Sequence, residues 1–259
     1  MSAPASGVFR FFLLTFAITW GLQVPGVLAQ AGRLPGDPQA YLPFAGLGML
    51  GPSVAALLVV RQQGSGVGPF LRQTFSARGL KVHWLLTGAL LPAVLLSAGL
   101  WVMGQLGRTG PLAYTPTLGA AVGGLVIALV EELGWRGFAY PRLEAKWGML
   151  AASGLLGVVW MVWHIPMFIG QHVPLNLLPI MLLFFVGASL WISALGKRSG
   201  MMFWSAVACH WGAHLNNSHR ALPGDLVPLL FHAIIYAALG VALVAGGLLV
   251  RSLKAARAM

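Results

Sequence analysis

The sequence predicts an all-α, polytopic membrane protein with about eight transmembrane helices in one bundle, and three observations support this fold class. Of 259 residues, 58% are hydrophobic and only 8% are charged, whereas a soluble domain carries roughly 25% charged residues. Apolar stretches near the ~20 residues that span a bilayer recur along the chain. Ten Trp and 13 Phe fit positions at membrane interfaces and between helices.

The predicted helices follow these apolar stretches in order. They cover 9–29, 43–61, 82–106, 117–142, 148–169, 174–195, 201–217 and 226–250. Eight crossings put both termini on one side of the membrane. The first stretch also resembles a cleavable signal peptide, because Arg10 precedes it and Ala29-Gln30-Ala31 ends it; cleavage would leave seven helices and the same orientation.

Neither the connections between these helices nor the chain as a whole shows a domain boundary. The link between the fifth and sixth helices is very short, and the loop 62–81 is expected to lie partly along the membrane surface. No run of Pro, Ser or charge divides the chain. We therefore expect residues 1–259 to form one membrane-embedded domain.

Lys and Arg residues are distributed unequally between the two predicted sides, and this bias orients membrane proteins. One side has Arg33, Arg108 and Arg220. The other side has twelve: Arg10, Arg61, Arg72, Arg78, Lys81, Arg142, Lys146, Lys197, Arg198, Arg251, Lys254 and Arg257. The bias predicts a multi-pass protein of the plasma (bacterial inner) membrane with both termini in the cytoplasm.

The net charge of +11 is spread over short loops, with no concentrated basic patch. We therefore expect the lipid bilayer, and no nucleic acid, as a partner. One cysteine, Cys209, excludes an internal disulfide framework. The sequence does not indicate an oligomeric state.

Two adjacent glutamates, Glu131 and Glu132, lie deep within an apolar stretch. A charged group at the bilayer centre costs roughly 2.5–3.5 kcal/mol on insertion scales, so it indicates function by default. Glu132 and Arg136 are four residues apart and are expected to form an ion pair on one helix face. Glu131 points about 100° away, toward another helix. Gly134 and Gly137 would allow close backbone approach there.

Three histidines are predicted at the depth of Glu131. Glu131 and His164 are each about 16 residues from a predicted turn near Gly148, roughly 24 Å along a helix. His210 and His214 are about 11 and 15 residues beyond a predicted turn near Gly200, and they share one helix face. One carboxylate and three imidazoles from three helices are therefore expected in one layer of the bilayer.

Such a group fits hydrolysis of an amide. A carboxylate with an imidazole can activate water as a general base, and imidazole N–H groups can stabilise an oxyanion. The chain contains neither G-x-S-x-G nor H-E-x-x-H, and Cys209 points about 100° away from His210 on a helix. No cofactor is expected, although Glu131, His164, His210 and His214 offer ligand atoms for Zn²⁺ as an alternative.

These motifs resemble the CPBP (CAAX protease and bacteriocin-processing, or Abi) family. Glu131, Glu132 and Arg136 match its E-E-x-x-x-R motif, and Trp160 with His164 matches its second motif. The motif core covers 117–218. The resemblance implies an eight-helix, glutamate-type intramembrane endopeptidase that acts on a membrane-anchored peptide or protein, in CAAX-type or bacteriocin-type processing. Members of the family are also labelled metallopeptidases.

The resemblance also implies roles for individual residues. Glu131 with His164 would activate water, and His210 would stabilise the oxyanion. Two positions depart from the family pattern: Trp160 stands where Phe is usual, and His214 stands where Asn is usual. Alternatively, Asn217 fills that polar position.

Two other functions stay open at this point. A self-immunity or binding protein could keep the fold without turnover. A proton-coupled transporter could use buried Glu and His groups as a relay.

Overall fold

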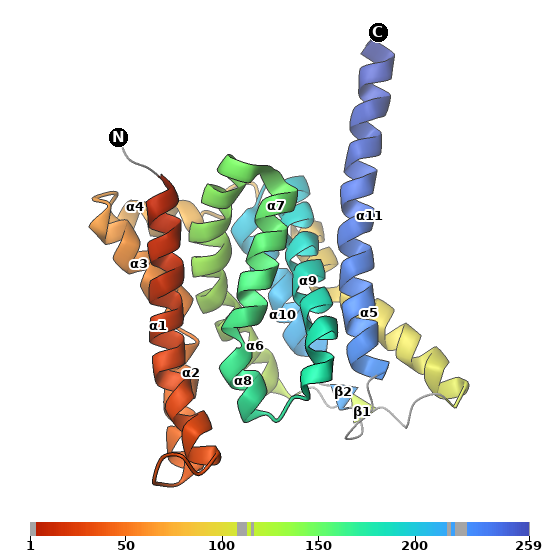
Figure 1. The fold of residues 1–259 in the computed structure, drawn as a ribbon. Helices are drawn as coiled ribbons and strands as arrows, with labels where there is room; N and C mark the ends of the chain where they lie inside the picture. The colour runs from red at the N-terminus through yellow and green to blue at the C-terminus, as the bar shows by residue number, and fades with distance from the viewer. Residues whose placement is uncertain (1–3, 108–112, 115–116, 217–218, 221–226, 259) are drawn as a thin grey trace.

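The computed structural model describes residues 4–107, 113–114, 117–216, 219–220 and 227–258. The chain forms an all-helical bundle (Figure 1). Its α-helices are α1 (Pro4–Gln30), α2 (Leu42–Gly48), α3 (Gly51–Gln62), α4 (Val67–Thr74), α5 (Val82–Gln105), α6 (Leu118–Glu132), α7 (Tyr140–Trp163), α8 (Ile165–Gly170), α9 (Leu178–Ser199), α10 (Met202–Asn216) and α11 (Val227–Ala258).

Short elements of other kinds connect these helices. Two 3-10 turns, η1 (Pro38–Tyr41) and η3 (Leu175–Leu177), precede α2 and α9, and a π-helix, η2 (Leu133–Ala139), joins α6 to α7. Two short strands, β1 (Ala113–Tyr114) and β2 (His219–Arg220), pair antiparallel. They do not change the all-α class.

The described residues of the eight predicted stretches are mostly helical, which confirms the all-α polytopic membrane fold. In the described part of the chain, four helical segments are long and apolar enough to span a membrane: Gly7–Gln30, Val82–Gln105, Leu118–Trp163 and Leu175–Ser199. A pair bent by 44°, Pro38–Gly48 with Gly51–Gln62, makes a fifth if the two count as one span. The number eight therefore stays a prediction.

The long segment Leu118–Trp163 reverses direction at the predicted turn. Gly148 interrupts α7 with φ 74° and ψ 170°, a conformation that favours glycine. The segments before and after Gly148 therefore run side by side. Residues far from the turn in either segment lie in the interior of the bundle.

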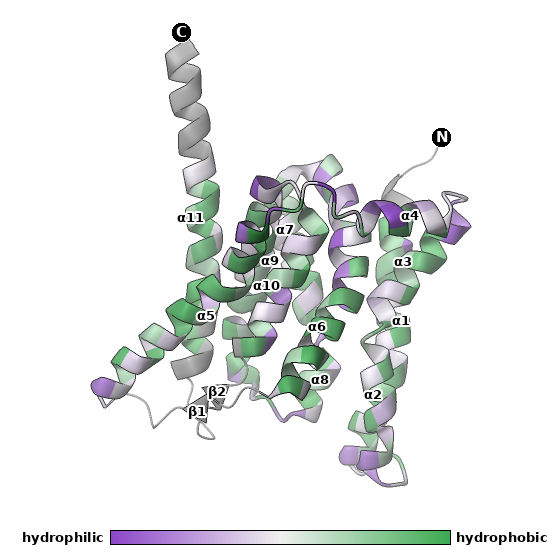
Figure 2. Ribbon diagram, turned by 180° about the vertical axis from the view of Figure 1, so that it is seen from behind, coloured by the Kyte–Doolittle hydropathy of each residue, from purple (hydrophilic) through white to green (hydrophobic). Residues whose placement is uncertain are grey.

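The bundle is organised around α9 and α10. Helix α9 packs against α7, α10 and α11, and α10 packs against α5 and α6, while α1 packs against α2, α3 and α8. Helix α1 begins and α11 ends at the same end of the bundle (Figure 1). Hydrophobic residues dominate the middle of the bundle, and hydrophilic residues gather toward its two ends (Figure 2). This distribution fits a protein embedded in a bilayer.

A close backbone contact holds η2 against α3. A Cβ atom at Gly134 would lie 2.5 Å from the carbonyl carbon of Pro52, so only glycine fits without a shift of the backbone. Nearby, Ser53 Oγ donates a hydrogen bond to the backbone oxygen of Val130. The predicted close approach at Gly134 is therefore present, and it fixes the segment that carries the two glutamates.

Candidate functional site

The two buried glutamates are the last residues of α6, directly before the π-helix η2. Glu131 is 1% exposed and Glu132 is 0% exposed. A regular α-helix was predicted over 117–142. In the structure, residues 133–139 instead form a π-helix with i→i+5 hydrogen bonds. Such turns occur frequently at functional sites. Nothing in the apolar periodicity of this segment signalled the change.

The ion pair predicted from the i,i+4 spacing is present. Arg136 Nη1 donates to both carboxylate oxygens of Glu132, at 2.9 and 3.0 Å, and both side chains are fully buried. His210 from α10 adds a third bond, because its Nδ1 lies 2.9 Å from Glu132 Oε1. Glu132 therefore links η2 to α10, a connection that the sequence analysis did not predict.

Glu131 faces α7, as its angular separation from Glu132 predicted. Its Oε2 accepts a hydrogen bond of 3.2 Å from Trp160 Nε1. Trp160 is 4% exposed, so both partners of this bond are shielded. The bond orients the carboxylate toward the part of α7 that ends at His164.

His164 lies at a break between α7 and α8. It ends α7 and begins α8 with φ −80° and ψ −4°, and Pro166 follows within two residues. One continuous helix was predicted over 148–169, although Pro166 has no N–H to donate and its ring clashes with the carbonyl of the residue four positions earlier, which breaks or kinks a helix. His164 Nδ1 lies 2.8 Å from the backbone oxygen of Trp160. Because a carbonyl oxygen only accepts, Nδ1 carries the proton and leaves Nε2 as the free ring nitrogen.

His210 and His214 stack on one face of α10. Their ring centroids are 4.9 Å apart, with an angle of 14° between the planes. His214 also lies against α6, since a Cβ atom at Gly124 would meet the His214 Cβ at 2.6 Å. Among the described residues, the buried Nε2 of His214 has no hydrogen-bond partner. The alternative residue, Asn217, lies outside the described residues.

The indole of Trp160 lies at the centre of the candidate residues. Its ring centroid is 5.1 Å from that of His210 and 6.0 Å from that of His164. The Arg136 Cζ lies over the same ring, 4.8 Å from its centroid. One side chain therefore contacts Glu131, Arg136, His164 and His210, which come from four different elements. The sequence indicated Trp160 only as the aromatic residue of the second family motif, because contacts between separate helices leave no local spacing signal.

The same residues do not form a metal site in this structure. Among the described residues, no three His, Cys, Asp or Glu side chains are placed so that they could hold a metal ion together. The Nδ1 atoms of His164 and His210 are already engaged by Trp160 and Glu132. The zinc alternative stays a prediction, and no step below passes through a metal.

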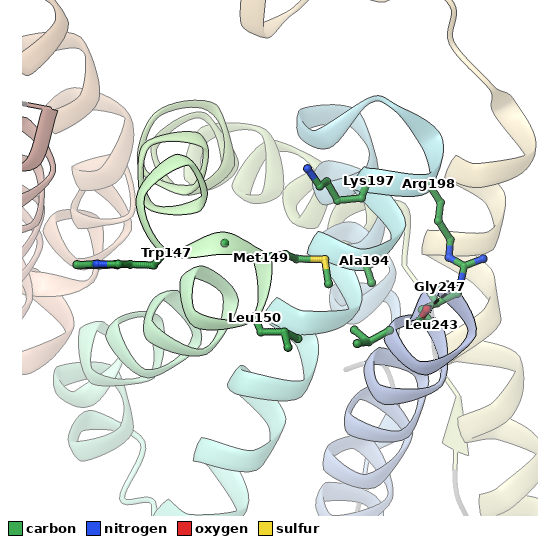
Figure 3. Close-up of a pocket in the computed structure, with 10 residues that line it drawn as sticks. Trp147, Met149, Leu150, Ala194, Lys197, Arg198, Leu243 and Gly247 are labelled. Atoms are coloured by element: carbon green, nitrogen blue, oxygen red, sulfur yellow. Dashed lines mark hydrogen bonds between the residues drawn. The ribbon is translucent and has the colours of Figure 1, made fainter. Parts of the chain in front are cut away.

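A separate cavity of about 440 Å³ lies between the turn of α7, the end of α9, and α11 (Figure 3). Trp147, Met149 and Leu243 contribute apolar walls, and Arg198 Nη2 donates to the backbone oxygen of Leu243 at 2.8 Å. None of the candidate residues lines this cavity. It is therefore distinct from the site around Trp160.

Two comparisons with known proteins concern the family that this chain resembles. Residues 113–216 match the family described as "Type II CAAX prenyl endopeptidase Rce1-like". A protein named "CAAX prenyl protease 2" from Methanococcus maripaludis is 25% identical over 168 residues. The chain spans 61% of the length of that relative, and the aligned part covers 61% of this chain. The matched region contains all of the described candidate residues, so the resemblance to the CPBP (CAAX protease) family is confirmed.

Proposed function

We propose that this protein is an intramembrane endopeptidase that hydrolyses a peptide bond of a membrane-associated substrate. The observation that supports it best is the buried carboxylate of Glu131, held by Trp160 within the cluster that contains His164 and His210. A buried carboxylate beside imidazole rings can accept a proton from water. The resemblance to CAAX proteases supports the same reaction class.

In the proposed reaction, Glu131 removes a proton from a water molecule and the hydroxide attacks the carbonyl carbon of the substrate. His164 orients this water through Nε2, because its Nδ1–H is bonded to Trp160. The tetrahedral intermediate then collapses, the C–N bond breaks, and Glu131 returns the proton to the leaving amine. Each atom is accounted for without a nucleophilic side chain.

The negative oxygen of the intermediate requires hydrogen-bond donors. His210 donates its Nδ1–H to Glu132, so it offers a second donor at Nε2 only when the ring is doubly protonated. In that state it forms an ion pair with Glu132. His214 stacks on His210, and its Nε2 has no partner among the described residues. We propose these two rings as the oxyanion donors.

The ion pair of Glu132 and Arg136 positions this assembly without entering the reaction. We place the end of the bundle with α4 and the start of α1 in the cytoplasm, because the twelve Lys and Arg residues of the sequence analysis fall on that side. The relative's name supports a prenylated CAAX-type substrate, and bacteriocin-type processing is the other class that the family resemblance allows.

The substitution Glu131→Gln tests the proposal. Glutamine keeps an oxygen that can accept the Trp160 hydrogen bond but cannot serve as a base, so the rate should fall by about 10²–10⁴-fold while the protein still folds. The measurement is mass spectrometry of a membrane-anchored peptide with a CAAX sequence after incubation with the protein in proteoliposomes. Glu144→Gln, at the partly exposed ion pair with Lys197, is the matched control and should cleave normally. A Glu131→Gln variant as fast as the wild type would exclude this function.

A further inference from the structure

A second cavity, of about 530 Å³, lies at the same end of the bundle as α4. It is separate from the cavity in Figure 3 and shares no lining residue with it. The described residues that line it come from α4, the loop before α5, η2, α7, the turn between α9 and α10, and the start of α10. They are Phe70, Gln73, Thr74, Ser76, Arg78, Arg136, Gly137, Pro141, Arg142, Gly200, Met201, Met202, Phe203 and Trp204.

Three arginines line this cavity, and none of the described lining side chains is acidic. Arg78 is exposed, Arg142 is half-buried, and Arg136 is 1% exposed. One guanidinium nitrogen of Arg142 donates to the Phe138 backbone oxygen at 2.8 Å, and its Cζ lies 3.8 Å from the centroid of the Phe138 ring. This packing holds the Arg142 cation at the wall of the cavity.

Arg136 provides the strongest sign of an anion-binding site. Its Nη1 is used by Glu132, but its buried Nε and Nη2 have no hydrogen-bond partner among the described residues. A buried charged donor without a partner is unfavourable and rare in folded proteins. Glu132 is also shared with His210, so the ion pair alone leaves Arg136 only partly satisfied. An anionic group in the cavity would complete it.

The start of α10 adds to the positive potential. The Ser205 N–H bonds to the Met201 oxygen, which makes Met201 the residue that caps α10. The N–H groups of Met202, Phe203 and Trp204 therefore have no partner within the helix. Residues 201–204 line the cavity, and the N-terminus of a helix favours anions.

From these contacts we propose that this cavity binds a phosphate group through Arg78, Arg136 and Arg142 at the N-terminus of α10. A phosphate monoester has about −1.5 to −2 charge and three strong acceptor oxygens, which suits several guanidinium groups better than a single carboxylate does. The group comes either from free phosphate or from a lipid headgroup in the surrounding membrane. The site shares Arg136 with the ion pair that positions Glu132, but the proposal of phosphate binding does not rest on the peptidase reaction.

The test is calorimetric titration of inorganic phosphate into the full-length protein in detergent, at constant ionic strength. We expect saturable binding that Arg78→Gln weakens about tenfold, as the loss of one charged hydrogen-bond partner implies. Arg61→Gln removes the same charge from the end of α3, does not line the cavity, and should bind normally. Arg142→Gln is the second test variant. Helix content and unfolding temperature are measured for each variant to show that it is folded.

Two further arms identify the source and the chemistry of the ligand. Stabilisation by phosphatidic acid in nanodiscs, relative to phosphatidylcholine, would support a lipid headgroup if it is lost in Arg78→Gln. Binding of inorganic phosphate alone would support free phosphate. Three results would overturn the proposal: no saturable effect of either phosphate source, equal weakening by Arg61→Gln, or acetate binding as tightly as phosphate.

Discussion

Glu132 and Arg136 form a buried ion pair, and we expect the two side chains to stabilise the fold through a strong mutual interaction. Replacing either one should therefore lower the free energy of unfolding. Two bonds of 2.9 and 3.0 Å join the groups, and both side chains are fully buried. Arg136→Met leaves the carboxylate with His210 as its remaining described partner. Breaking one side of a buried pair costs about 3–5 kcal/mol. We expect Arg136→Met to lose about that amount.

The double variant Glu132→Gln with Arg136→Met should lose less than the sum of the two single changes. Glutamine can still accept the bond from His210, and no uncompensated charge stays buried. The resulting coupling energy should be about 2–3 kcal/mol, at the upper end of values for contacting residues. Denaturant titration of the four proteins in bicelles, followed by circular dichroism, measures it.

A second ion pair among the described residues is the matched control. Lys197 and Glu144 are 2.7 Å apart, but their side chains are 51% and 22% exposed. Exposed pairs contribute about 0.2–1 kcal/mol, so the cycle with Lys197→Met and Glu144→Gln should give a coupling of that size. A coupling at Glu132 and Arg136 no larger than this would refute the argument that burial makes the pair important.

Three further outcomes follow from the same structure. Gly134→Ala places a Cβ 2.5 Å from the Pro52 backbone. It should lower the unfolding free energy by about 1–3 kcal/mol in the same denaturant titration. Gly154→Ala, whose added Cβ would meet no atom within 4 Å, should leave the unfolding free energy unchanged. Trp160→Phe removes a donor to a buried carboxylate and should cost about 1.5–3 kcal/mol; the exposed Trp101 changed to Phe should leave stability unaltered. Peptide cleavage should continue after dialysis against a chelator, because the proposed reaction uses Glu131 as the base and His164 to orient the water, without a metal. Loss of cleavage that Zn²⁺ restores would contradict this.

The sequence predicted those features that depend on local spacing. Apolar runs of membrane length located the helices, and i,i+4 spacing identified the bond between Glu132 and Arg136. Equal distances from Gly148 placed Glu131 and His164 on two adjacent segments, and the structure joins these segments through Trp160. These predictions need only helix geometry and one turn.

Features that depend on contacts between helices were not predictable in the same way. The bond of His210 to Glu132 joins residues 78 positions apart, and the angle between α6 and α10 decides whether it forms. The cavity lined by three arginines could likewise be predicted only if the relative positions of α4, η2 and α10 were known. The break at His164 had a signal in Pro166, which membrane-length hydropathy outweighed in the prediction.

The π-helix η2 has a consequence for the chain that follows it. An i→i+5 turn accommodates about one more residue than an α-helical turn, so it rotates everything downstream by about 100° relative to an uninterrupted α-helix. Tyr140 and Leu143 are buried in this rotated phase. Deleting one residue from 133–139 would restore an ordinary helix yet swing those side chains away from the core, so a shorter chain would be locally more regular and globally misassembled.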